Sequence, residues 1–178
     1  MSEPTLQIVA AMGARQAVML DAARAELVRR LGAGWQIRLD YVPFDRPPAA
    51  PILILSLDDD VGEADEHFAS TALRWRDRIA GLAGTGRLLL CNLPRNEGWH
   101  RATIGSAKIR RLNRLAIDLS REWHIEIVDL DRSLALSGGG DPAVQALRAG
   151  QLLAAALIEG GGEPGGVAFP VERRLPSR

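Results

Sequence analysis

Residues 52–60 read ILILSLDDD, a run of isoleucine and leucine around one serine that ends in three aspartates. A short apolar run bounded by polar, turn-forming residues is typical of a β-strand that is covered on both faces. Two further runs have the same character, IVAA at residues 8–11 and LLLC at residues 88–91. Strands of this kind belong to parallel sheets between helical layers, so the three runs predict the centre of such a sheet.

Two more segments complete the predicted sheet. Gln36–Val42 alternates apolar and polar residues, which suits an edge strand with one solvated face. The link that follows it, PFDRPPAAP at residues 43–51, is too short for an ordinary helical crossover. Either this link crosses the sheet in an extended form, or Gln36–Val42 is an antiparallel edge. The predicted strands are Leu6–Ala11, Gln36–Val42, Ile52–Leu57, Arg87–Leu93 and Ile125–Leu130.

Segments of helical period separate these strands. They are Ala14–Leu31, Ala64–Leu82, Gly105–Trp123 and Pro142–Glu159, the last with Asp141 as its expected N-cap. Alternating strands and helices predict a three-layer α/β/α sandwich with a mostly parallel, five-stranded, flavodoxin-like sheet. We expect one domain over residues 4–159, followed by a flexible tail over residues 160–178 that is rich in glycine and proline.

The composition narrows the class of protein. The 22 basic and 22 acidic residues cancel, so no overall charge favours nucleic acid or a membrane surface. No run reaches the roughly 18 apolar residues of a membrane span, and the first residues do not read as a signal peptide, so we expect a cytoplasmic protein. Cys91 is the single cysteine and lies in an apolar run, which indicates a buried, inert thiol. We expect no metal and no cofactor.

The second half of the chain resembles the SGNH (GDSL-type) hydrolase family. Residues 110–135, RRLNRLAIDLSREWHIEIVDLDRSLA, are similar to that family's penultimate helix, with its asparagine in an LN pair, and to the following strand, which ends in VDL. ILILSLDDD is similar to the third strand with its G-x-N-D block, and LLLCNLPR to the fourth strand. Residues 137–157 are similar to the closing D-G-x-H-P loop and the last helix. The resemblance covers residues 5–158, and none of its motifs is intact.

The resemblance implies an ester hydrolase, but the residues that would do this chemistry are replaced. Where the family has its nucleophilic serine, this chain reads Met12-Gly13-Ala14-Arg15, which offers no hydroxyl or thiol. Gly138 and Asp141 stand at the positions of the family's aspartate and histidine, and Asp58 replaces the oxyanion-hole asparagine. We therefore expect a catalytically degenerate domain that acts as a binding, accessory or assembly protein, with a protein partner or a second copy of itself.

The alternative is a hydrolase that has rebuilt its site at the carboxyl ends of the strands, where ligands of such sheets bind. The aspartates at residues 58–60 favour a solvated loop with one helix cap, although oxygen ligands also suit a divalent cation. A basic helical face at residues 108–114 favours a solvated surface over a phosphate or acidic-partner site. Candidate catalytic residues are Asp58, Asp59, Asn92 and His100; candidate ligand-binding residues are Gly13, Arg15, Arg95 and Asp141.

Overall fold

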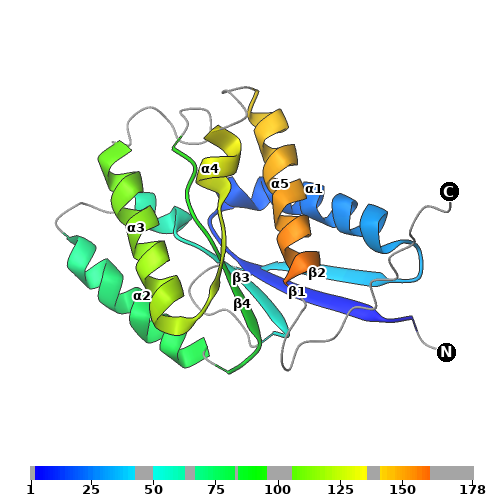
Figure 1. Cartoon of the computed structure of the whole chain (residues 1–178), viewed down its shortest axis with the longest axis horizontal. Coiled ribbons are helices and arrows are strands. Elements are labelled where there is room, and N and C mark those ends of the chain that lie inside the picture. The colour runs from blue at the N-terminus through cyan, green and yellow to red at the C-terminus, as the bar shows by residue number, and fades with distance from the viewer. Residues whose placement is uncertain are drawn as a thin grey trace, which may run out of the picture.

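The structure is a computed structural model that describes residues 3–42, 50–62, 67–82, 84–95, 106–135 and 141–160. A five-stranded sheet in the order β2-β1-β3-β4-β5 forms its centre, and every neighbouring pair of strands is parallel. Figure 1 shows the sheet between two groups of helices, which confirms the predicted three-layer α/β class. The strands are β1 (Thr5–Ala11), β2 (Gln36–Val42), β3 (Ile52–Ser56), β4 (Arg87–Cys91) and β5 (Glu126–Val128).

The edge strand β2 resolves the alternative that the short link after it left open. It pairs with β1 in parallel, with Thr5 opposite Gln36 and Ala11 opposite Val42, so the antiparallel arrangement is wrong. The chain must therefore return from the carboxyl end of β2 to the amino end of β3 between Val42 and Ile52. Residues 43–49 of this link lie outside the described residues.

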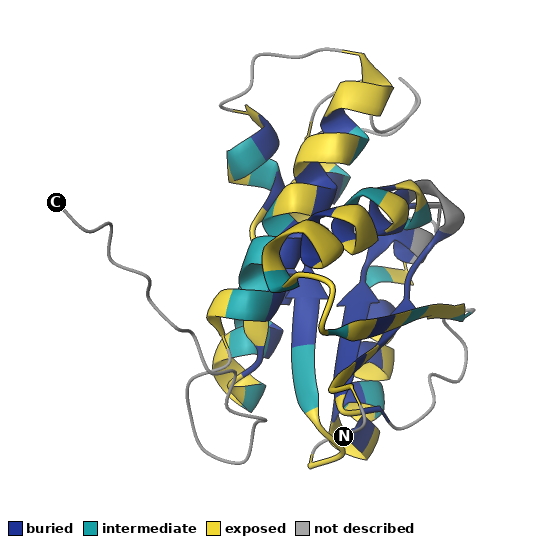
Figure 2. Cartoon of the chain, turned by 90° about the vertical axis from the view of Figure 1, so that its right-hand side faces the viewer, coloured by how far each residue is buried: buried dark blue, intermediate teal, exposed yellow. Residues whose placement is uncertain are grey.

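The helices pack on the two faces of the sheet and build two cores. Helices α1 (Ala14–Leu31), α4 (Leu130–Ala135) and α5 (Pro142–Glu159) cover one face, and α2 (Phe68–Leu82) and α3 (Ser106–Trp123) cover the other. Figure 2 shows the buried residues concentrated in the strands and on the inward sides of the helices. Among the described residues, no helix is long and apolar enough to cross a membrane.

The fifth strand is shorter than its apolar residues predict. The expected strand Ile125–Leu130 ends at Val128, because Leu130 already begins α4. Asp129 stabilises the start of this helix, since its Oδ1 accepts a hydrogen bond from the backbone N–H of Arg132 at 3.1 Å. Leu130 and Leu134 are both buried, one helical turn apart. A short 3₁₀ helix, η1 (Asp58–Gly62), similarly follows β3.

Arg87, at the start of β4, joins the sheet to the end of α5. Its Nη1 donates to the carbonyl of Leu157 at 2.8 Å and its Nη2 to that of Ala156 at 2.7 Å. Its Nε lies 2.6 Å from Oε1 of Glu126 in the neighbouring strand. A guanidinium at a helix C-terminus satisfies carbonyl groups that have no partner within the helix, so this contact closes the last turn of α5.

Candidate functional site

The carboxyl ends of the five parallel strands form one edge of the sheet, the carboxyl edge, which is the usual ligand site of this architecture. Gly13 follows β1, Asp58 follows β3 and Asn92 follows β4, so three of the predicted segments meet at this edge. Asp141 begins α5, which packs against α4 after β5 (Figure 1). This arrangement is consistent with the prediction that these segments gather on one side of the sheet.

The polar residues after β4 and β5 bond to one another and form a group that we name the β4–β5 latch (Asn92, Arg95, Asp129 and Asp131). Asn92 donates from Nδ2 to Oδ1 of Asp129 at 2.7 Å, and its Oδ1 accepts from the backbone N–H of Asp131 at 3.0 Å. The backbone N–H of Arg95 donates to Oδ1 of Asp131 at 2.9 Å, and its Nε lies 2.7 Å from Oδ2. The hydrogen bond to Asp131 raises the pKa of Arg95.

Asn113 in α3 supports the same loop and was not among the predicted site residues. Its Nδ2 donates to the carbonyl of Leu93 at 2.8 Å, and its Oδ1 accepts from the N–H of Leu93 at 2.8 Å. This buried amide replaces the backbone partners that Leu93 loses where β4 ends. The asparagine of the LN pair therefore has a visible structural role, which its place in a helical repeat did not indicate.

The three aspartates after β3 do not form a solvated loop, so that prediction is wrong for Asp58 and Asp60, which are 5% and 4% exposed. The N–H of Asp58 donates to Oγ of Ser56 at 3.1 Å. Asp60 accepts from Nε1 of Trp75 and from Nη2 of Arg74, each at 2.6 Å, so it anchors α2. The side chain of Asp59 is not among those that the structure describes. The described residues contain no group of three histidine, cysteine, aspartate or glutamate side chains that could hold a metal ion.

Gly13 and Asp141 begin helices. The carbonyl of Gly13 accepts from the N–H groups of Gln16 and Ala17 at 3.0 and 3.1 Å, and no side chain caps the N-terminus of α1. Asp141 is the predicted N-cap of α5, since its Oδ1 accepts from the N–H of Ala143 at 2.9 Å. His100, Gly138 and the side chain of Arg15 lie outside the described residues.

Gln16, in the first turn of α1, was missed by the sequence analysis. Its side chain is fully buried, and neither its Nε2 nor its Oε1 has a hydrogen-bond partner among the residues that the structure describes. An unpartnered amide in the interior costs about 1–3 kcal/mol, so such groups in folded proteins call for an explanation such as a bound water, ion or ligand. A glutamine on a helical stripe gives no sign of this in the sequence, because its surroundings come from other segments.

No family model matches this chain, and no curated protein matches its sequence. Several solved structures are nevertheless similar to it in fold. A lipase/acylhydrolase from Enterococcus faecalis superposes with a TM-score of 0.65 over 92% of this chain and 100% of its own, at 14% identity. An acetylxylan esterase from Geobacillus stearothermophilus gives a TM-score of 0.54 over 95% of this chain and 100% of its own, at 11% identity. The chain has an SGNH-hydrolase-like fold.

An α/β hydrolase from the metagenome of Lake Arreo, Spain, also superposes on this chain, with a TM-score of 0.54 over 86% of this chain and 93% of its own, at 12% identity. At such identities the likeness concerns the fold. The single cysteine of the chain, Cys91, ends β4 close to the carboxyl edge and is fully buried. Burial raises the pKa of Cys91 to about 12, so it stays a neutral thiol near neutral pH, as its apolar surroundings predicted.

Proposed function

We propose that this chain is a catalytically degenerate SGNH-like domain that acts by binding, as an accessory or assembly protein, and does not hydrolyse esters. The observation that carries the proposal is the β1–α1 turn, Met12-Gly13-Ala14-Arg15, which occupies the carboxyl edge without a hydroxyl or thiol. Acyl transfer through a covalent intermediate requires such a nucleophile next to a general base. A protein partner or a second copy of this chain is the occupant that we propose for the binding role.

The state of the neighbouring polar groups supports the same proposal. The side chains of Asn92 and Asp129 already bond to each other, and Asp131 bonds to Arg95. These bonds hold the loops after β4 and β5 together, which gives the groups a structural role. Asp141 is engaged as a helix cap. The described contacts of Asn92, Asp129, Asp131 and Asp141 therefore favour a structural role for these four residues over a rebuilt hydrolase site.

The first test is for ester hydrolysis by the purified chain. We expect p-nitrophenyl acetate to be consumed at the rate of buffer containing the same chain unfolded, a control for reactive surface groups. We also expect a fluorophosphonate probe to leave the protein unlabelled, because the β1–α1 turn provides no hydroxyl or thiol nucleophile. Saturable turnover that disappears on unfolding, with the probe attached to one serine or threonine in the mass spectrum, would overturn the proposal.

Gln16 offers a second test, because a group retained for binding is expected to reduce stability. Substituting leucine for Gln16 removes an unpartnered buried amide and keeps its approximate volume. We expect Gln16→Leu to raise the free energy of unfolding by about 1–2 kcal/mol, measured by urea denaturation. Gln151→Leu, at an exposed position in α5, is the matched control, and its change is expected within about 0.5 kcal/mol. A clear loss of stability in Gln16→Leu would show that the amide is needed for packing.

A further inference from the structure

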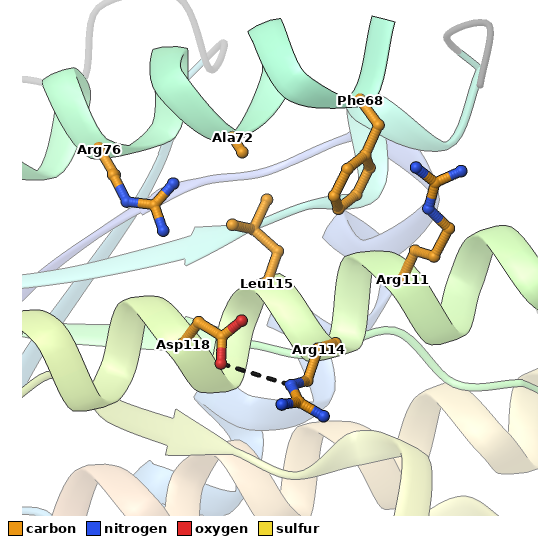
Figure 3. Close-up of a pocket in the computed structure, with 7 residues that line it drawn as sticks. All are labelled: Phe68, Ala72, Arg76, Arg111, Arg114, Leu115 and Asp118. Atoms are coloured by element: carbon orange, nitrogen blue, oxygen red, sulfur yellow. Dashed lines mark ion pairs between the residues drawn. The ribbon is translucent and has the colours of Figure 1, made fainter. Parts of the chain in front are cut away.

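A groove of about 290 Å³ lies between α2 and α3, on the outer side of the helical layer and apart from the residues of the carboxyl edge described above. Figure 3 shows its lining, with side chains from the two helices converging on one space. This volume is at the small end of the range for ligand pockets, so it suits a small organic molecule. The lining residues are Phe68, Ala72, Arg76, Arg111, Arg114, Leu115 and Asp118.

Arg111 gives the groove its defining charge. Its guanidinium carbon lies 4.4 Å from the centre of the Phe68 ring, over the face of the ring, which is a cation–π contact. None of the ion pairs between described residues involves Arg111. The ring thus holds the cation in place while its N–H groups stay available to an anion.

The other charged residues of the lining are in ion pairs of their own and leave the charge of Arg111 in place. Arg76 pairs with Glu122, with Nε 2.9 Å from Oε2. Arg114 lies 3.4 Å from Asp118, and with side-chain exposures of 75% and 45% this pair is a weak interaction in water. Of the three lining arginines, Arg111 is therefore the one that has no ion pair with a described residue, and this cation favours an anion in the groove.

The rest of the lining is apolar and consists of Phe68, Ala72 and Leu115. A sugar or polyol would bring hydroxyl groups against these carbon surfaces and leave them without partners. A molecule with one anionic end and an apolar body meets both halves of the groove. We propose that this groove binds small amphipathic carboxylates, with the carboxylate on Arg111 and the apolar part against Ala72 and Leu115.

This proposal also explains part of the basic face at residues 108–114, for which a solvated surface was the favoured interpretation. Arg110, Arg111 and Arg114 are all exposed, as that interpretation predicts. Arg111 in addition points toward α2 and Phe68, whereas Arg114 is turned toward Asp118 on the side of α3 away from α2, as Figure 3 shows. The site is distinct from the carboxyl edge, and its occupation does not depend on whether the chain hydrolyses esters.

The test is calorimetric titration of the purified full chain with octanoate, accompanied by 1-octanol and acetate as the two halves of the same probe. We expect saturable binding of octanoate, and binding of octanol and of acetate weakened by about tenfold or more, because each lacks one of the two contacts. Arg111→Ala removes the cation and Ala72→Trp fills the groove, so each is expected to weaken octanoate binding by about tenfold or more. Arg121→Ala, an exposed arginine of α3 outside the groove, is the matched control and is expected to bind as the parent chain does.

Thermal unfolding of each variant shows whether it has kept its fold. If the bulkier Ala72→Trp variant does not fold, Arg111→Ala still tests the proposal. Absence of saturable octanoate binding to the parent chain at about 10 mM would overturn the proposal. Equal binding of octanol, or octanoate binding that neither variant weakens, would overturn it as well. A change of oligomeric state in Ala72→Trp without octanoate binding to the parent would assign the groove to a second copy of the chain. None of these results bears on the esterase assay, so the two proposals can fail separately.

Discussion

Replacing Gly150 with alanine is expected to lower the free energy of unfolding by about 2–3 kcal/mol, although alanine is the better helix former. Gly150 lies in α5 where this helix crosses α1. A Cβ atom at this position would lie 2.6 Å from Cβ of Ala22, from the backbone nitrogen of Ala23 and from the carbonyl oxygen of Met19. Two of these three atoms are backbone, so no side-chain rotation relieves the contact and the two helices must move apart.

Urea denaturation measures this loss, provided that the slope of the free energy of unfolding against urea concentration is the same in the variant and the parent chain. Gly81→Ala is the matched control, because Gly81 also lies in a helix and a Cβ atom there would meet nothing within 4 Å. We expect that variant to be unchanged or stabilised by up to about 1 kcal/mol, the gain in helix propensity. If Gly150→Ala behaved like Gly81→Ala, α1 and α5 would not approach as closely as the structure has them.

Asp60→Ala is expected to destabilise the protein by about 3 kcal/mol. The substitution removes two charge-assisted hydrogen bonds of 2.6 Å, one from the indole of Trp75 and one from the guanidinium of Arg74. Trp75 is fully buried, so water cannot take the place of the lost carboxylate at the indole N–H. Asp60→Asn keeps an acceptor for the indole and loses the charge, so we expect it to cost about half as much.

Glu122→Ala is the control for this prediction, since Glu122 also pairs with an arginine of α2 but is exposed. Surface pairs of this kind contribute about 0–1 kcal/mol, so its effect is expected to be small. A double-mutant cycle with Trp75→Phe measures the interaction of the carboxylate with the indole. Purely additive effects of Asp60→Ala and Trp75→Phe would contradict the contact.

Most of the fold was predictable because burial leaves a local signature in each element. The three apolar runs became the central strands, and the helical stripes gave the four long helices with bounds close to those observed. The prediction was wrong at Ile125–Leu130, where apolar residues continue across the junction of β5 and α4. Hydrophobicity cannot mark such a junction, because Leu130 is buried whether it lies in a strand or in a helix.

The location of the candidate residues in the fold was predictable from the sequence, but the hydrogen-bond partners of their side chains were not. The rule that ligands bind at the carboxyl ends of parallel strands selected Gly13, Asp58 and Asn92, and the structure puts all three at that edge. Whether a polar side chain there is available depends on its partners. Asn92 bonds to Asp129, 37 positions later in the chain, and no spacing rule connects the two.

The sequence by itself determined the class of fold, the absence of a nucleophile at residues 12–15 and the burial of the single thiol, since these depend on side-chain chemistry and on periodicity within one element. Only the tertiary structure decided that Asp60 anchors Trp75, that Gln16 is buried without a partner in the described part of the chain and that Arg111 stacks on Phe68 over a groove. Each of these depends on groups from separate elements that meet only when the sheet and its helices assemble, so their energies cannot be read from either segment alone.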